Sequence, residues 1–237
     1  MKTYAFPSAI LALLLSTAVG ATSLFVRPTT VILSGGQSAA AVTVTNSGDT
    51  PVTAQLRVFT WDQNENEDKL DPTTALAASP PMMTIPAGQS QTIRLVRTEK
   101  TPAKREESYR LLVDEIVDRA AVTGTGVAIQ LRYSVPVFVM PRSDAAAKLS
   151  FKAAVDNGTL VIDAVNRGQS HAQIANVSLK YADGSSQLVG SGLVGYVLPD
   201  RNRQWKLQLP PGVAATAQGQ PQRVRAMVNG QELLVAL

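Results

Sequence analysis

The sequence lacks cysteine altogether and contains a single histidine, His171. Without cysteine the chain can form no disulfide, no thiol nucleophile and no cysteine-ligated metal site. A lone histidine in an expected turn is typical of a surface residue, and it leaves no nucleophile–base pair and no zinc site. The glycines form neither a phosphate loop nor a dinucleotide-binding fingerprint. We therefore expect no enzyme, no metal and no cofactor, with a cofactor-free hydrolase as a distant alternative.

Aromatic residues and net charge are also scarce. Aromatic side chains make up 5% of the chain, and the formal net charge is +4 with a sequence pI near 9.5. Nucleic-acid-binding proteins cluster their basic residues and interleave them with aromatic ones, whereas the excess of basic residues here is small and spread out. We expect the charged side chains to be solvated surface groups. Neither a nucleic acid nor a small-molecule substrate is an expected partner.

Long apolar runs are absent beyond the N-terminus. Lys2 and the apolar run 9–15, followed by small residues, match a secretory signal peptide. We expect residues 1–20 to be removed by cleavage near Gly20 or Ala21. No later segment reaches the roughly 20 apolar residues that a membrane-spanning helix needs. The sequence therefore predicts a soluble, exported protein.

Apolar and polar residues alternate with period two through most of the remaining chain, as in β-strands. Turn signals such as Asn157-Gly158 and Asn229-Gly230 separate these runs. The pattern predicts an all-β fold of two immunoglobulin-like β-sandwich domains, residues 21–142 and 143–237. The acidic run 62–71 lacks the order of a calcium-binding loop, so we expect a solvated loop there. The strands we expect are residues 24–33, 38–46, 52–61, 83–85, 92–96, 108–117, 127–139, 149–155, 160–166, 174–181, 195–198, 204–209, 224–228 and 233–237.

The run 127–139 is the longest expected strand and has one continuous apolar face. Pro136 has no N–H to donate to a neighbouring strand, so we expect at least part of the run at a sheet edge. An exposed apolar edge is a template for pairing with other chains. Either the fold of the protein covers this edge, or pairing with another chain is its purpose. Its apolar face is made of Val127, Ile129, Leu131, Tyr133, Val135, Val137 and Val139.

The strand expected at 108–117 carries Arg110. Alternation places Tyr109 and Leu111 on the core face and Arg110 on the opposite face. If this strand lies beside 127–139, the guanidinium could bind a carboxylate through two parallel hydrogen bonds. A solvent-exposed strand arginine is the alternative interpretation.

Seven short motifs stand in one order along the first domain, and an eighth lies in the second. They are RPT at 27–29, TNSG at 45–48, RVFTW at 57–61, SPP at 79–81, AGQSQTIRL at 87–95, SYRLLVDEI at 108–116, LRYSVPVFV at 131–139 and GYVLP at 195–199. Together they resemble the periplasmic pilus and fimbrial assembly chaperones of the chaperone–usher pathway, which have a PapD-like fold.

The resemblance implies two immunoglobulin-like domains in a boomerang arrangement and a non-catalytic function in the periplasm. Such a chaperone binds and stabilises pilin subunits by donor-strand complementation and delivers them to an outer-membrane usher. The residues implied to fill the subunit's groove are Val127, Ile129, Leu131 and Tyr133. We expect Ile129 and Leu131 to be exposed in the free protein. A secreted adhesive or structural β-sandwich protein is the alternative.

The resemblance also implies how the subunit is anchored. The best-known members hold the subunit's terminal carboxylate with an arginine on the first strand and a lysine on the long strand. The matching positions here carry Thr30 and Pro136, neither of which can carry charge. The sequence is instead similar to the divergent archaic, Csu-type branch, in which an arginine in an SYRL motif is the anchor, and this implies Arg110. Arg94 and Glu115 match positions that the family uses for internal or interdomain ion pairs.

Overall fold

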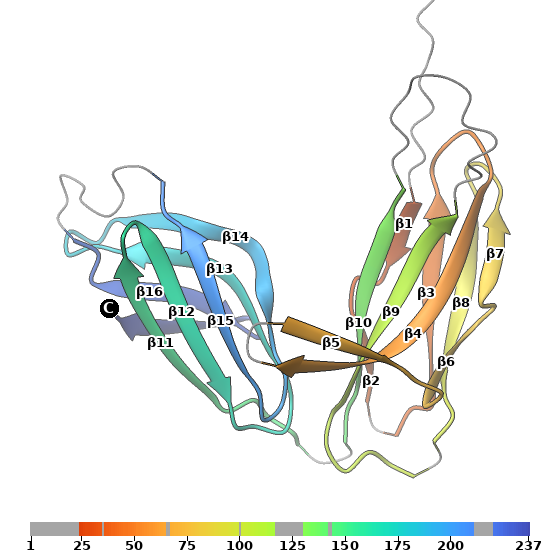
Figure 1. Ribbon diagram of the computed structural model, residues 1–237, viewed down its shortest axis with the longest axis horizontal. Coiled ribbons are helices and arrows are strands. Elements are labelled where there is room, and N and C mark those ends of the chain that lie inside the picture. The colour runs from red at the N-terminus through yellow and green to blue at the C-terminus, as the bar shows by residue number, and fades with distance from the viewer. Residues whose placement is uncertain are drawn as a thin grey trace, which may run out of the picture.

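The computed structural model describes residues 24–34, 36–64, 67–99, 101–116, 130–141, 144–210 and 220–237. Within these ranges all the regular secondary structure is β-strand, which confirms the expected all-β fold. None of these residues forms a helix that could cross a membrane. The strands build two sandwiches that stand as the two arms of a V (Figure 1).

The first sandwich packs a four-stranded sheet, in the order β1-β3-β8-β6, on a sheet in the order β2-β10-β9-β4-β5, with β7 added along β4. Inward-facing apolar residues of both sheets, such as Val44, Ile93, Leu111 and Val137, are fully buried. Burying such side chains stabilises the fold by roughly 1.5–3 kcal/mol each. Its strands are β1 (Leu24–Arg27), β2 (Val31–Leu33), β3 (Ala39–Asn46), β4 (Val52–Asn64), β5 (Glu67–Pro72), β6 (Leu76–Ser79), β7 (Met82–Ile85), β8 (Ser90–Arg97), β9 (Glu107–Ile116) and β10 (Arg132–Val139).

The second sandwich packs the sheet β11-β12-β15 on the sheet β14-β13-β16-β17. Asn157-Gly158 and Asn229-Gly230 adopt positive φ angles, as expected for tight hairpin turns. A separate apolar core fills this sandwich. Its strands are β11 (Leu149–Asp156), β12 (Thr159–Asn166), β13 (Ala172–Lys180), β14 (Ser186–Val197), β15 (Asn202–Gln208), β16 (Arg223–Val228) and β17 (Gln231–Ala236).

Four expectations about strands are wrong. Gln130 and Leu131, expected within the strand 127–139, lie outside β10, which begins at Arg132. The single strand expected at 24–33 is two strands, β1 and β2, which lie in opposite sheets on either side of residues 28–30. Pro28 in this interval cannot donate a ladder hydrogen bond. The loop expected at 62–71 is instead a hairpin, because β4 continues to Asn64 and β5 pairs back along it. Strand β14 starts at Ser186 rather than at residue 195.

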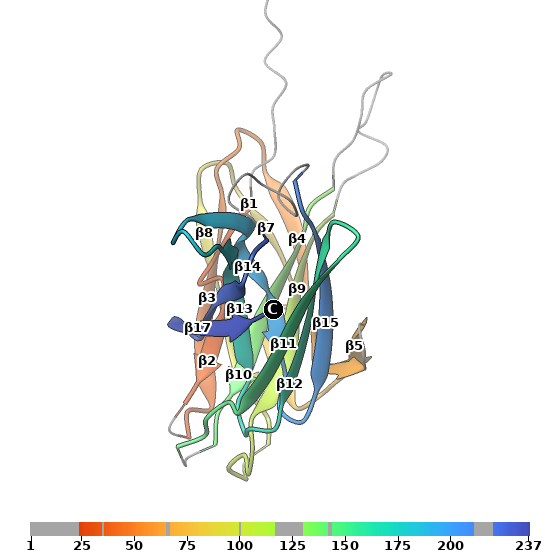
Figure 2. The same ribbon diagram turned by 90° about the vertical axis from the view of Figure 1, so that its left-hand side faces the viewer.

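The β4–β5 hairpin extends beyond the first sandwich toward the second domain (Figure 1). Viewed from the side of the second domain, β5 stands at one edge of the molecule, next to β15 (Figure 2). Strand β4 contacts β15 directly. The hairpin is therefore positioned to join the two domains. The domain boundary predicted between residues 142 and 143 falls outside the described ranges and stays a prediction.

Candidate functional site

Strand β10 has a free edge over part of its length. It pairs antiparallel with β9 from Arg132 to Val139. On its other side it pairs with β2, in parallel, only from Val137 to Val139. Ahead of Val137, that side of β10 has no partner strand within the described part of the chain. Strand β10 is thus an edge strand over its first half, as the position of Pro136 predicts.

The side chains of β10 alternate as the sequence predicts. Tyr133 packs against the first core, and its hydroxyl donates a hydrogen bond to the backbone carbonyl of Leu24. Farther along, the core-facing residues of the strand are fully buried. These are Val135, Val137 and Val139.

Leu131, just before β10, is half-buried rather than exposed, which corrects the expectation for this residue. The Glu115 N–H donates to the Leu131 carbonyl oxygen at 3.0 Å, and the Leu131 N–H donates to the Glu115 carboxylate at 3.3 Å. These bonds hold Leu131 beside β9. Val127 and Ile129, the other two predicted groove-filling residues, lie outside the described residues.

Asp114 on β9 connects three neighbouring strands. Its carboxylate is 5% exposed and accepts hydrogen bonds from Arg57 of β4, at 2.7 Å, and from Arg132 of β10. Burial by itself would raise the pKa of Asp114, but the hydrogen bonds from Arg132 and Arg57 outweigh burial and lower the pKa. Because Arg132 opens β10, this ion-pair cluster holds the free half of that strand in register with β9.

A cavity of about 450 Å³ lies between the domains, next to the free edge of β10. Its walls include Arg110, Ser134 and Pro136 from the first sandwich. Thr30, which precedes β2, lines it as well. The second domain contributes residues of β14 and β15, among them Tyr196.

Arg110 projects into this cavity from β9, directly opposite Pro136 in the ladder. Its guanidinium lies 3.6 Å from the centre of the Trp61 ring and is 14% exposed as a side chain. Its polar contacts are long, at 3.8 Å to the Asp68 carboxylate and 3.4 Å to the Ser134 carbonyl oxygen. Burial lowers the pKa of Arg110, and the charge of Asp68 acts in the opposite direction. A fixed cation with weak partners is well suited to bind an added carboxylate.

Aromatic residues of both domains meet at the floor of the V. Trp61 and Phe138 from the first sandwich pack with Tyr196 from the second, with ring centroids 5.6–5.9 Å apart. Phe138 is fully buried although it points away from the first core. This cluster fixes Trp61, which in turn supports Arg110.

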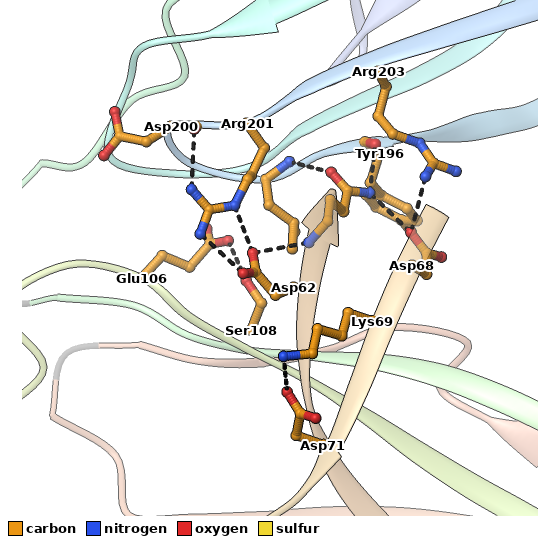
Figure 3. Close-up of polar contacts among 12 residues, drawn as sticks. Asp62, Asp68, Lys69, Asp71, Glu106, Ser108, Tyr196, Asp200, Arg201 and Arg203 are labelled. Carbon is orange, nitrogen blue, oxygen red and sulfur yellow. Dashed lines mark hydrogen bonds and ion pairs between the residues drawn. The ribbon is translucent and has the colours of Figure 1, made fainter. Parts of the chain in front are cut away.

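The β4–β5 hairpin binds the second domain through polar groups. The amide of Gln63, which is 3% exposed, donates to the Tyr196 carbonyl oxygen at 3.0 Å and accepts from the Leu198 N–H at 2.9 Å. Asp62 accepts two hydrogen bonds from Arg201, at 2.6 and 2.9 Å, and Figure 3 shows this pair facing across the domain interface. The Arg201 hydrogen bonds lower the pKa of Asp62.

His171 is a second contact between the domains, so its expected place on the surface is wrong. Its ring stacks on Phe138 at 3.6 Å between centroids and is 13% exposed. The ring Nδ1 lies 2.8 Å from the carboxylate of Glu106, which also accepts the His171 backbone N–H at 2.9 Å. Glu106 is fully buried as a side chain. Both partners of the histidine come from the other domain, which explains why its local sequence looks like a surface turn.

Neither Arg94 nor Glu115 lines the cavity. Arg94 lies exposed on β8, and Glu115 is buried at the end of β9. Within the described ranges neither residue forms an ion pair, and their expected pairing stays a prediction. Across the same residues, no group of three His, Asp or Glu side chains is placed to hold a metal ion.

The family model for pili and flagellar-assembly chaperones, PapD N-terminal domain, matches residues 23–144. The chain belongs to this family. The match spans the first sandwich, with β10 and Arg110, and it confirms the resemblance read from the motifs. Among curated proteins, no sequence matches this pilus chaperone.

Solved chaperone structures share its two-domain fold. The CsuC–CsuE chaperone–tip adhesion subunit pre-assembly complex, from the archaic chaperone–usher Csu pili of Acinetobacter baumannii, gives 22% identity and a TM-score of 0.64 over 90% of this chain and 97% of that chain. The Salmonella enterica SafA pilin–SafB chaperone complex gives 18% identity and a TM-score of 0.61, over 93% of this chain and 99% of that chain. The Pseudomonas aeruginosa CupB2 chaperone gives 20% identity and a TM-score of 0.57, over 90% of this chain and 100% of that chain. The likeness confirms the pair of immunoglobulin-like sandwiches.

Proposed function

We propose that this protein is a periplasmic chaperone that binds and stabilises pilin subunits by donor-strand complementation. The observation that carries the proposal is the free edge of β10 beside a cavity that holds Arg110. An unpaired strand edge offers N–H and C=O groups to a partner strand, and alternating apolar side chains determine which groove fits. A subunit that lacks one strand has such a groove.

The groove-filling face consists of Val127, Ile129, Leu131 and Tyr133 in this proposal. Each apolar side chain that passes from water into the groove contributes roughly 1.5–3 kcal/mol. The gain is smaller for Leu131 and Tyr133, because both are already half-buried in the free protein, Leu131 beside β9 and Tyr133 against the first core.

Arg110 anchors the subunit's C-terminal carboxylate and thereby sets the register of pairing. A slip of one residue would turn every side chain of the donor strand to the wrong face. A charge-assisted contact at one end of the strand excludes such slips. The long distances from Arg110 to its present partners leave its donors available for this contact.

The remaining parts of the proposal follow from family membership. The chaperone acts as a non-enzymatic protein, without a cofactor, a nucleic acid or a small-molecule substrate. It delivers its subunits to an outer-membrane usher. Residues 1–20 are the signal peptide that directs it to the periplasm, and residues 21–142 and 143–237 are its two domains. The SYRL motif around Arg110 supports membership of the archaic, Csu-type branch.

Co-expression with a candidate pilin subunit, followed by purification of the complex from the periplasm, tests the donor strand. The wild type is expected to yield an equimolar complex. Replacing Ile129 and Leu131 together by Asp should abolish capture, because two carboxylates cannot be buried in an apolar groove. The circular dichroism spectrum of the free variant should match that of the wild type. Unchanged capture would exclude this strand as the donor.

The same assay tests the anchor. Arg110→Ala should weaken binding by roughly 2–5 kcal/mol, since it removes a charge-assisted contact to the subunit's carboxylate. Arg110→Lys should restore only part of the loss, because an ammonium lacks the planar fork of donors. Arg94→Ala is the matched control, an exposed strand arginine outside the cavity. The anchor lies elsewhere if Arg110→Ala binds like the wild type while Arg94→Ala or Arg132→Ala does not.

A further inference from the structure

The cavity contains a second arginine, Arg203, which comes from β15 of the second domain. Its side chain is 17% exposed. The buried Nε and Nη1 atoms make no hydrogen bond to any described residue. The ion pair of Nη1 with the Asp68 carboxylate, at 3.5 Å, is longer than a well-formed charge-assisted hydrogen bond. Arg203 therefore lines the cavity and has two buried donors that no described residue satisfies.

Arg110 and Arg203 share one carboxylate. Asp68 on β5 lies 3.8 Å from Arg110 through Oδ2 and 3.5 Å from Arg203 through Oδ1 (Figure 3 shows the Arg203 pair). Its Oδ1 also accepts a hydrogen bond from Gln63 at 3.2 Å. The two guanidinium groups are thus close enough for one carboxylate to contact both, even though they belong to different domains.

The charges that line the cavity do not balance. Two arginines and one aspartate are the charged residues among its walls, which leaves one positive charge in excess. Asp68 is 38% exposed, so water weakens its attraction for both cations. Burial, and to a smaller extent the nearby charge of Arg203, lower the pKa of Arg110. One added anion would neutralise the cavity.

We propose that Arg203 is a second carboxylate-binding residue and that it acts together with Arg110 on the terminal carboxylate of the subunit. This inference rests on the proposed function and adds to it a contact made by the second domain. The two guanidinium groups bind the carboxylate from opposite domains. They act in the same cavity as Thr30 and Pro136, the uncharged residues at the positions where the resemblance implies a first-strand and a long-strand cation. A purely structural role for Arg203, pairing the hairpin with β15, is the competing explanation.

The test compares two forms of one synthetic peptide with the sequence of the last strand of a candidate pilin subunit. One form ends in a free carboxylate and the other in a carboxamide. Binding of each to the full-length chaperone is measured by titration calorimetry. The wild type should prefer the carboxylate form. Arg203→Gln should weaken binding of the carboxylate form about tenfold and leave binding of the carboxamide form unchanged.

Arg201→Gln is the matched control. Arg201 also joins the hairpin to the second domain, through Asp62, but it does not line the cavity. Its replacement should affect both peptide forms equally or not at all. Equal weakening of both forms by Arg203→Gln, or no weakening of either, would overturn the role of Arg203. A wild type without preference for the carboxylate would instead overturn the carboxylate anchor, and Arg110 with it.

Discussion

Arg110 is held in place mainly by packing rather than by polar partners. Its guanidinium carbon lies over the Trp61 ring, 3.6 Å from the ring centre, while its ion pair with Asp68 is 3.8 Å long. Stacking on an aromatic ring orients an arginine without consuming its hydrogen-bond donors. The chain thereby keeps a charged group preorganised for a ligand that has yet to bind.

Asp114 is the opposite kind of residue, a carboxylate whose partners are satisfied. Asp114→Asn should lower the free energy of unfolding by about 1–2 kcal/mol, because Arg57 and Arg132 lose their shared anion but remain largely solvated. Urea denaturation at neutral pH measures the loss. Asp163→Asn, on an exposed strand position of β12, is the control. An unchanged unfolding midpoint would contradict the role given to this cluster.

The same residue predicts a pH dependence. The pKa of Asp114 in the folded protein is below its ordinary value of 3.8, so the folded state binds fewer protons than the unfolded state in this range. Its contribution to stability is complete above the ordinary value and is lost as the pH falls through the lowered pKa. The stability difference between the wild type and Asp114→Asn should therefore shrink on acidification, as urea denaturation at several pH values can check.

At the scale of elements, the β4–β5 hairpin both joins the domains and supplies Asp68 to the cavity. Asp68→Asn should strengthen binding of a subunit that ends in a free carboxylate by about three- to tenfold, since a carboxylate that competes for both arginines is lost. Asp71→Asn, on the same strand but away from the cavity, should leave binding unchanged. Weaker binding by Asp68→Asn would mean that Asp68 only positions the arginines.

Alternation of apolar residues was sufficient to predict the sandwiches and the face of β10, because these elements bury their side chains against their own domain. It failed where the burying partner lies in the other domain. Gln63 and Asp68 read as loop residues, yet they form part of a hairpin that the second domain covers. Phe138 of the first domain and His171 of the second stack on each other across the domain interface. Arg203 has no local signal, since its role depends on a cavity formed by distant segments.

At the scale of the whole molecule, the angle between the domains depends on a few buried contacts. Gln63→Ala would leave the Tyr196 carbonyl and the Leu198 N–H without partners, at a cost of about 1–3 kcal/mol each. We expect a lower melting temperature and, by small-angle scattering, a larger radius of gyration as the domains separate. Gln91→Ala, at an exposed position of β8, is the control. Identical scattering from the two variants would show that the other interdomain contacts hold the angle without Gln63.

The cavity has one wall in each domain, with Arg110 on β9 and Arg203 on β15. A group bound to both walls is a reversible cross-link, so its binding and the closure of the V are thermodynamically coupled. By reciprocity, a captured subunit that binds both walls also restrains the position of the second domain, with which its strand does not pair. A partner that opens the V would likewise loosen the subunit's end without competing for the donor strand.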